Sequence, residues 1–311
     1  MWRPGTVAAT ILVMKTVSGF VSVLLLAGAI AGCGAAPADP TKGARVVNVV
    51  ASMNMWGDVA RQIGGRHASV TSIIASPSDD PHLYASSPRD AERLARANLV
   101  VLNGLGYDDW AHKLLDASSS SKRHELTIAD ALKPTGSNPH LWYDAPRLPD
   151  AARAIADALA AQDPRDKAYF HANASRFVAS LQPLLDTIAT IENRHPGAPV
   201  AYTERVPEYL LDAAGLNVET PRAYAQAVED GSEPNPGDVQ RMNDLVSKRD
   251  VDALLYNAQA VTPATKRLRA LATSSHVPVV PVTETLPPGL TFQRWQTDQA
   301  RALLAALGDA A

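Results

Sequence analysis

Short apolar runs alternate with stretches of helical spacing along most of the chain. Val46–Ala51 is a β-branched run typical of a strand, and the helical spacing of Trp56–Ile63 follows it and stops at Gly64 and Gly65. The alternation continues with strands predicted at 70–74, 99–102 and 126–128 and helices at 88–97 and 108–115. Strands and helices that alternate in this way predict a parallel sheet covered by helices.

The same rhythm begins again after Pro199. Strands are predicted at 200–203, 216–218, 253–256 and 277–282, and helices at 207–214, 236–247, 263–271 and 292–307. The second series resembles the first in pattern without repeating its sequence. We therefore expect an α/β protein with two (βα) lobes, each built around a parallel-type sheet.

The longest predicted helix lies between the two series, at 164–194, after a shorter one at 151–160. Its apolar residues are spaced alternately by four and three positions, so they form one buried stripe. They are Phe170, Ala174, Phe177, Leu181, Leu184, Ile188 and Ile191. Pro183 lies inside this helix and should kink it. We expect one long helix to join the two lobes, and a coiled coil with a partner helix is the alternative explanation of the stripe.

Residues 1–33 have the composition of an export signal. Arg3 and Lys15 are the only charges before the apolar run Val21–Ile30, which is too short to span a bilayer. The run closes on Ile-Ala-Gly-Cys, which resembles the lipobox at which bacterial lipoproteins are cleaved. We expect Cys33 to become the lipidated N-terminus, and an ordinary secretory signal is the alternative. A start at Met14 would give a signal of ordinary length.

The predicted organisation is therefore a lipoprotein signal at 1–33, a tether at 34–44, an N-terminal lobe at 45–163, a linking helix at 164–197 and a C-terminal lobe at 198–311. Removing the leader removes two cations and no acid, which changes the formal charge from −3 to −5. A mildly acidic exported chain suits a cation better than nucleic acid. Because Cys33 is the only cysteine, the exported body can form no intrachain disulfide and no thiolate metal site.

Two five-residue motifs, Asp80–Tyr84 and Asn138–Trp142, have almost the same letters. Both read polar residue, proline, histidine, leucine, aromatic residue. Proline stiffens the backbone just before His82 and His140. Both motifs follow predicted strands, and the carboxyl ends of parallel strands meet at one edge of a sheet. We therefore expect the two imidazoles at the same rim, the alternative being two unrelated loop histidines.

The second lobe offers carboxylates at matching places. Glu204 directly follows one predicted strand, and Glu284 follows another after one residue. Two imidazoles and two carboxylates carry a charge of −2, which a divalent cation neutralises, and such a set suits Zn(II) and nearly as well Mn(II). We expect Glu208 on an exposed helix surface. Asn257 and Gln259, past another strand end, are candidate donors to a carboxylate.

These residues resemble those of the metal-binding lipoproteins of bacterial zinc and manganese ABC importers. The resemblance covers residues 45–308, and its specific motifs are Asp-Pro-His at 80–82 and Asn-Pro-His followed by Trp at 138–142. It implies two lobes bridged by a long helix and one metal ion in the inter-lobe cleft. The ligands that it implies are His82, His140, Glu204 and Glu284.

The chain departs from the family pattern at two of these positions. Glu284 stands in a Thr-Glu-Thr context where most members have Asp, and the longer side chain permits bidentate binding. Glu204 stands where several zinc-specific members carry a third His, and the His-rich acidic loop of many such members is missing. The coordination number and the choice between zinc and manganese therefore stay open at this point.

The resemblance predicts an extracytoplasmic lipoprotein that binds Zn(II), or alternatively Mn(II), as cargo. The expected partners are the membrane subunits of an ABC permease, with a lipid anchor at the outer face of the cytoplasmic membrane, a monomeric chain and no nucleic acid. An exported zinc-dependent hydrolase would also use two His and a Glu, but the chain has no HExxH and no Gly-x-Ser-x-Gly motif. A structural scaffold would leave both histidine motifs unexplained.

Replacing His140 by Ala should weaken Zn(II) binding far more than His124→Ala or His171→Ala, because only His140 lies in a repeated motif. Isothermal titration of the three variants with Zn(II) measures the difference. Similar losses at all three positions would mean that the metal binds elsewhere.

Overall fold

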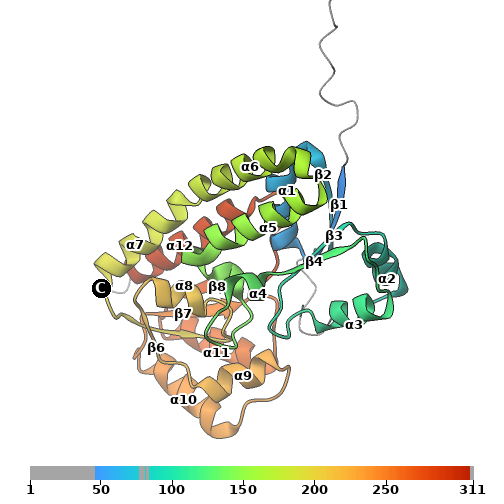
Figure 1. Ribbon diagram of the computed structural model, residues 1–311. Helices are drawn as coiled ribbons and strands as arrows, with labels where there is room; N and C mark the ends of the chain where they lie inside the picture. Colours follow the sequence, from blue (N-terminus) through green and yellow to red (C-terminus); the bar gives the residue numbers. More distant parts are fainter. Residues whose placement is uncertain (1–45, 77–80, 82–83, 309–311) are drawn as a thin grey trace, which may run out of the picture. The chain divides into compact units, whose positions relative to one another are not determined.

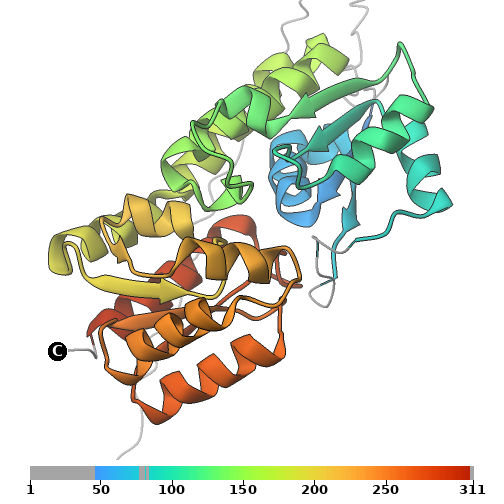
Figure 2. The ribbon, with the colours of Figure 1, turned by 90° about the horizontal axis from the view of Figure 1, so that it is seen from below.

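The computed structural model describes residues 46–76, 81 and 84–308 (Figure 1). The fold is built on two separate four-stranded sheets, in which every strand pair is parallel. The first contains β1 (Val47–Met53), β2 (Ala68–Ile74), β3 (Leu99–Leu102) and β4 (His124–Thr127). The second contains β5 (Pro199–Tyr202), β6 (Asn217–Val218), β7 (Ala253–Asn257) and β8 (Val279–Val282). Figure 2 shows the first sheet in blue to green and the second in yellow to red.

Both sheets have the same topology. The strand orders are β2-β1-β3-β4 and β6-β5-β7-β8. In the first sheet β2 lies on one side of β1, and β3 and β4 lie on the other. In the second sheet β6 lies on one side of β5, and β7 and β8 lie on the other. All residues of β3 and β7 are buried, because helices cover both faces of a parallel sheet. In such sheets, ligands bind beyond the carboxyl ends of the two strands at which the order reverses. Those strands are β1 and β3 in the first sheet and β5 and β7 in the second.

Helices fill the connections and cover the sheets. The first half contains α1 (Asn54–Gly64), α2 (Pro88–Ala95), α3 (Asp109–Ala117), α4 (Ile128–Leu132) and α5 (Leu148–Gln162). The second half contains α8 (Glu208–Ala213), α9 (Arg222–Glu229), α10 (Pro236–Ser247), α11 (Pro263–Ser274) and α12 (Phe292–Gly308). Single 3-10 turns lie at Gly65–His67, Leu141–Tyr143, Ala145–Arg147 and Pro164–Asp166. The two-sheet α/β fold class predicted from the sequence is confirmed.

The long connecting segment consists of two helices, α6 (Lys167–Ser180) and α7 (Gln182–Arg194), which follow each other in Figure 1. They are separated at Leu181, just before Pro183. Proline has no N–H to donate to the carbonyl four residues earlier, and its ring clashes there. The predicted kink is therefore a break between α6 and α7, and Pro183 lies in the first turn of α7. The stripe packs within the chain, since α6 contacts α1 and α5 while α7 contacts α12.

Two helices were absent from the sequence prediction. The first, α4, is a single turn that ends at Leu132 and is followed by Lys133, whose φ is +49°. The second, α9, carries buried Tyr224, Ala225 and Val228 at helical spacing, a pattern that the sequence does contain. The tryptophans at 56 and 295 lie in the core.

The leader, Cys33 and the tether lie outside the described residues, and so does residue 45 at the start of the predicted first lobe. Within the part of the chain that the structure describes, no helix has the length and apolarity needed to cross a membrane. The predicted boundaries at 163 and 197 stay predictions.

The loop between β3 and α3 has an unusual backbone. Gly104, Leu105 and Gly106 have φ values of +86°, +55° and +82°, and the Tyr107 N–H donates to the Gly104 carbonyl at 3.2 Å. Positive φ at both central residues is the signature of a type I′ turn. A Cβ added at Gly104 would lie 2.6 Å from Thr127 Cγ2 and 2.8 Å from Ala129 Cβ, whereas one added at Gly106 meets nothing within 4 Å.

Gly104→Ala should therefore destabilise the protein more than Gly106→Ala. Both substitutions force alanine into the left-handed region, at a cost of about 1–2 kcal/mol. Only the first also overpacks the interior, which adds about 1–3 kcal/mol. Urea unfolding of the two variants measures the difference, and equal losses would show that the packing against Thr127 and Ala129 relaxes freely.

Candidate metal-binding site

The predicted ligands among the described residues lie beyond the carboxyl ends of strands, and Glu284 follows β8, which pairs with β7. Glu204 comes two residues after β5, next to β7, which ends at Asn257. His140 lies on a long loop that is attached to the end of β3, because Asn103 Nδ2 donates to the Pro139 carbonyl at 2.8 Å. Parallel topology therefore brings these loops to positions where ligands are usually bound.

His140 is completely buried, and Asn138 fixes its orientation. The Asn138 amide donates to the Arg205 carbonyl at 2.9 Å and to Glu208 Oε2 at 2.8 Å. Its Oδ1 must therefore be the acceptor that faces His140 Nδ1 at 2.6 Å. This assigns the ring proton to Nδ1 and leaves the lone pair on Nε2, the arrangement in which histidines bind metals.

The two carboxylates are joined by one amide group. Asn257 Nδ2 donates to Glu204 Oε2 at 2.6 Å and to Glu284 Oε1 at 2.7 Å. Glu204 and Glu284 are 1% and 0% exposed. A buried pair of carboxylates repels, so a donor placed between them keeps them together. Asn257 is the carboxylate donor that the sequence suggested.

His140 and Glu284 meet directly, although they come from opposite halves of the chain. His140 Nε2 lies 3.4 Å from Glu284 Oε2. The Tyr107 hydroxyl donates to this oxygen at 2.6 Å. The Tyr107 ring lies edge-on to His140, with ring centroids 5.7 Å apart, and packs against Trp142 at 5.1 Å. One oxygen of Glu284 thus accepts from the phenol and lies beside the imidazole.

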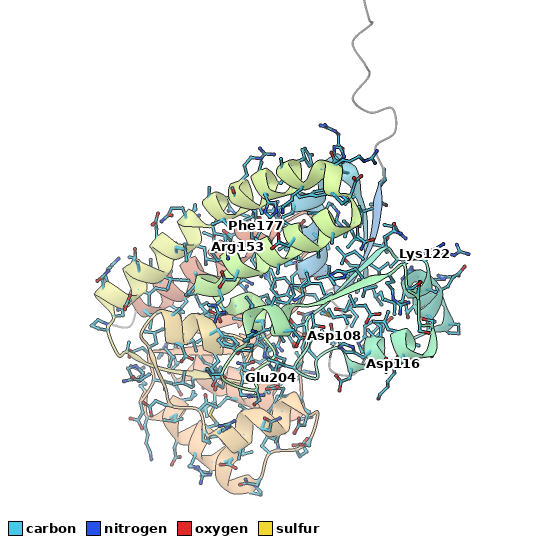
Figure 3. The ribbon with its side chains drawn as sticks, in the orientation of Figure 1. Asp108, Asp116, Lys122, Arg153, Phe177 and Glu204 are labelled. Atoms are coloured by element: carbon cyan, nitrogen blue, oxygen red, sulfur yellow. The ribbon has the colours of Figure 1, made fainter. Side chains whose placement is uncertain are left out.

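A buried carboxylate holds the loop that carries Tyr107. Asp108 Oδ2 accepts from Asn103 N at 2.6 Å and from Ser52 Oγ at 2.6 Å, while Oδ1 accepts from Gly104 N at 2.9 Å. Burial raises the pKa of the Asp108 carboxyl, and the three hydrogen bonds act against that increase. Figure 3 labels Asp108 and Glu204.

Further contacts tie residues of the first half to the loop around Glu284. The Tyr143 hydroxyl lies 2.8 Å from the Thr283 carbonyl and 2.7 Å from Gln299 Oε1. Burial and the nearby Glu284 carboxylate raise the pKa of Tyr143 well above its usual range, so the phenol stays protonated. Asn54 donates to the Leu286 carbonyl at 2.8 Å and accepts from its N–H at 2.9 Å.

The fourth predicted ligand, His82, lies outside the described residues. Within residues 46–76, 81 and 84–308, no three or more His, Cys, Asp and Glu side chains form a group that could hold a metal ion. The described residues bring His140 and Glu284 together and connect Glu204 to them through Asn257. The ligand assignment of all four residues stays a prediction.

The structure differs from the expectation for Glu208. Glu208 is half-buried instead of exposed, because its carboxylate accepts from Asn138 and lies 3.2 Å from the Tyr202 hydroxyl. Gln259 holds the loop of Glu284, because its Oε1 accepts from the backbone N–H of Glu284 at 2.6 Å and of Thr285 at 3.0 Å. Its predicted role as a donor to a carboxylate stays a prediction.

No functional role was predicted from the sequence for Tyr107, Tyr143 or Asp108. Tyr107 and Asp108 come after the predicted strand at 99–102 and the Gly-Leu-Gly stretch at 104–106. A polar residue soon after a strand end is the signal that could have identified them. Tyr143 directly follows the second histidine motif, where only the fold reveals its partner.

Two cavities flank this region. One of about 310 Å³ is lined by Tyr107, Pro139 and Glu229, and one of about 410 Å³ is lined by Asn138 and Glu208. Arg205 lines both and pairs with Glu229 at 2.8 Å.

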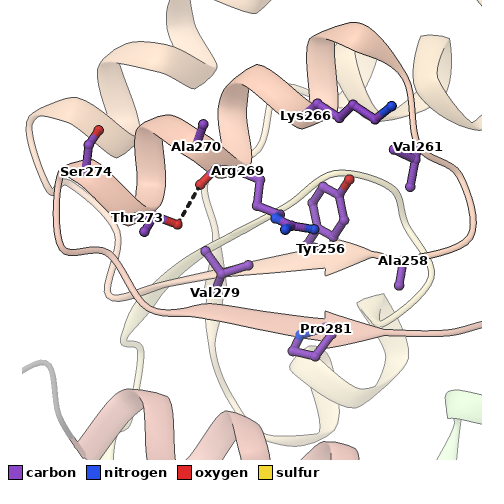
Figure 4. Close-up of a pocket in the computed structure, with 10 residues that line it drawn as sticks. All are labelled: Tyr256, Ala258, Val261, Lys266, Arg269, Ala270, Thr273, Ser274, Val279 and Pro281. Atoms are coloured by element: carbon purple, nitrogen blue, oxygen red, sulfur yellow. Dashed lines mark hydrogen bonds between the residues drawn. The ribbon is translucent and has the colours of Figure 1, made fainter.

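A third cavity, of about 900 Å³, lies between α11 and the β7–β8 edge of the second sheet (Figure 4). Apolar residues and the cations Lys266 and Arg269 line it, and the Arg269 guanidinium lies 5.3 Å from the centre of the Tyr256 ring. Two positive charges make this cavity unsuitable for a metal ion.

Comparisons with known proteins agree in matching the chain to proteins named for metal uptake or metal binding. A family model described as the periplasmic component A of a zinc-uptake complex matches residues 49–306. The manganese-binding lipoprotein MntA of Halalkalibacterium halodurans is 27% identical over 249 residues, which cover 78% of this chain and 81% of that protein. The manganese ABC transporter substrate-binding lipoprotein PsaA of Streptococcus pneumoniae is 23% identical over 261 residues, covering 79% and 82%.

Solved structures show the same fold. The substrate-binding protein FpvC of Pseudomonas aeruginosa, in complex with Mn²⁺, matches with a TM-score of 0.73 and 19% identity and covers 86% of this chain and 100% of that chain. The periplasmic zinc-binding protein TroA of Treponema pallidum matches with a TM-score of 0.72 and 18% identity, covering 84% and 99%.

Asp108→Ala should lower the free energy of unfolding by at least about 2 kcal/mol, because it leaves two buried backbone N–H groups without an acceptor at about 1–3 kcal/mol each. Asp109→Ala, at the exposed neighbouring position, should cost less than about 1 kcal/mol. Urea unfolding measures both. A similar loss for the two variants would show that the loop does not depend on the Asp108 carboxylate.

Proposed function

The chain belongs to the family of periplasmic zinc-uptake component A proteins, and from that premise we propose that it captures one divalent transition-metal ion outside the cytoplasm and delivers it to an ABC permease. The observation that carries the proposal is the buried contact between His140 Nε2 and Glu284 Oε2, 3.4 Å apart. An imidazole in its metal-binding tautomer and a carboxylate from the other half of the chain meet there.

We propose His82, His140, Glu204 and Glu284 as the ligands. Glu204 is held beside Glu284 by Asn257, and His140 is oriented by Asn138. Asn257 and Asn138 are the kind of outer partners that fix metal ligands in one orientation. His82 completes the set on the strength of its Asp-Pro-His motif, which matches the motif around His140.

Zinc is the cargo that we propose, with manganese as the second candidate. Two imidazoles and two carboxylates are ligands of the kind that zinc sites use, and the 3.4 Å between His140 Nε2 and Glu284 Oε2 lets both atoms contact one ion. Manganese is favoured by the names of MntA and PsaA and by the ion bound to FpvC. Nearly any such site binds Zn(II) more tightly than Mn(II), so the cellular cargo must be measured in the cell.

We propose that the protein works as a binding component and not as a hydrolase. The relatives reported above are binding proteins by name. A catalytic zinc keeps one coordination position for water, whereas the proposed set supplies four protein ligands.

Elemental analysis of protein from its native envelope, together with growth of a deletion strain under zinc or manganese starvation, distinguishes zinc from manganese as the cargo.

The proposed location follows from the leader and the relatives. MntA and PsaA are lipoproteins by name, and Cys33 closes a lipobox-like sequence. We propose that residues 1–33 are the signal, that Cys33 carries the lipid, and that residues 34–44 tether a monomeric body to the outer face of the cytoplasmic membrane. The membrane subunits of the permease are the proposed partners.

The metal-free protein, prepared with a chelator and freed of it, should bind close to one equivalent of Zn(II) in a titration. At 100 times Kd the ion should stabilise the fold by about 2.7 kcal/mol. Glu204→Gln should weaken binding more than about 100-fold, because outer partners alone contribute about 10- to 100-fold. Glu219→Gln is the matched control, since Glu219 also follows a strand of the second sheet but is exposed. Absence of Zn(II) and Mn(II) binding by the unaltered protein would refute the proposed function.

A further inference from the structure

We propose that Tyr107 determines metal specificity by holding the Glu284 carboxylate so that a single oxygen faces the ion. The inference rests on the proposed function, because it takes Glu284 as a ligand. Tyr107 would not bind the metal. It is a positioning residue that acts through Glu284 and favours a four-coordinate ion over a six-coordinate one.

The hydrogen bonds of Glu284 define the plane of its carboxylate. Oε1 accepts from Asn257 Nδ2 at 2.7 Å, and Oε2 accepts from the Tyr107 hydroxyl at 2.6 Å. Two donors on two different oxygens fix the rotation of the group about its last torsion. Oε2 is the oxygen next to His140 Nε2, so it is the one that faces the proposed ion. Oε1 stays with Asn257, which also holds Glu204.

Tyr107 cannot easily follow a carboxylate that rotates. Its ring packs on His140 and Trp142 and is 5% exposed. Its backbone closes the turn that begins at Gly104, and the next residue, Asp108, is held by three hydrogen bonds. The phenol is therefore a fixed donor that reaches Glu284 from the other half of the chain.

The consequence for the metal follows from geometry. A glutamate that is free to rotate can offer both oxygens, which raises the coordination number and suits Mn(II), whereas one oxygen suits tetrahedral Zn(II). The 3.4 Å between His140 Nε2 and Glu284 Oε2 allows both atoms to reach one ion at the roughly 2.0–2.1 Å of zinc ligands.

The test compares the unaltered protein with Tyr107→Phe and Tyr143→Phe. Phenylalanine keeps the ring in both variants and removes only the hydroxyl. Tyr143 is the matched control, because it is also a buried tyrosine that reaches the Glu284 loop but contacts the Thr283 carbonyl instead of a carboxylate oxygen. The measurements are Kd values for Zn(II) and Mn(II) on metal-free protein and the visible spectrum of the Co(II)-loaded protein, whose bands are intense for four ligands and weak for six. Thermal unfolding without metal confirms that each variant is folded.

Tyr107→Phe should lower the ratio of Zn(II) to Mn(II) affinity by about tenfold or more, the scale of outer-partner effects, and should weaken the Co(II) bands. Tyr143→Phe should leave the ratio and the spectrum unchanged. An unchanged ratio in Tyr107→Phe, or the same change in both variants, would overturn the role of Tyr107 while leaving the proposed function intact. If the unaltered protein binds neither ion, the proposed function itself falls.

Discussion

The amide of Asn257 is the contact on which the candidate site depends. Two glutamates that are almost completely buried would repel each other, and a low dielectric strengthens that repulsion. An amide nitrogen has two hydrogens, so Asn257 donates one to Glu204 and one to Glu284, at 2.6 and 2.7 Å. This keeps both carboxylates at the end of the second sheet, and the remaining charge of −2 is what a divalent cation would compensate.

The rest of the fold serves to bring an imidazole to these carboxylates. Parallel sheets with reversed strand order gather loops at their carboxyl edges, and both sheets have the same order. The loop of His140 is tied to β3 through Asn103, and the loop of Glu284 is tied to the first half through Tyr107 and Tyr143. Because Asn103 and Tyr107 are neutral, they position His140 and Glu284 without adding a charge that would compete with the metal, whereas the Tyr143 hydroxyl contacts the Thr283 carbonyl and Gln299.

Sequence patterns predicted the parts of this structure that depend on hydrophobic periodicity and strand ends. The strand at 99–102 has the predicted bounds, and Glu204 lies beside a strand end as expected. What the patterns could not predict are contacts between side chains that lie far apart in the sequence. Tyr107 and Glu284 are 177 positions apart, and no local spacing connects them. Glu208 was misjudged for the same reason, since its burial depends on Asn138, 70 positions away.

A protein that delivers its cargo must also release it, and the division of the proposed ligands makes this possible. His140 belongs to the first half of the chain, and Glu204 and Glu284 belong to the second. Structural zinc sites reach apparent binding energies of about 10–16 kcal/mol, whereas each neutral hydrogen bond between the halves contributes about 1 kcal/mol. The contacts of Tyr143 and Asn54 are therefore weak beside the metal. The halves also share a hydrophobic core, in which the rings of Trp56 and Phe292 stack with their centroids 6.3 Å apart. The ion would add to contacts that already join the halves, and moving one half relative to the other would remove part of its ligand shell.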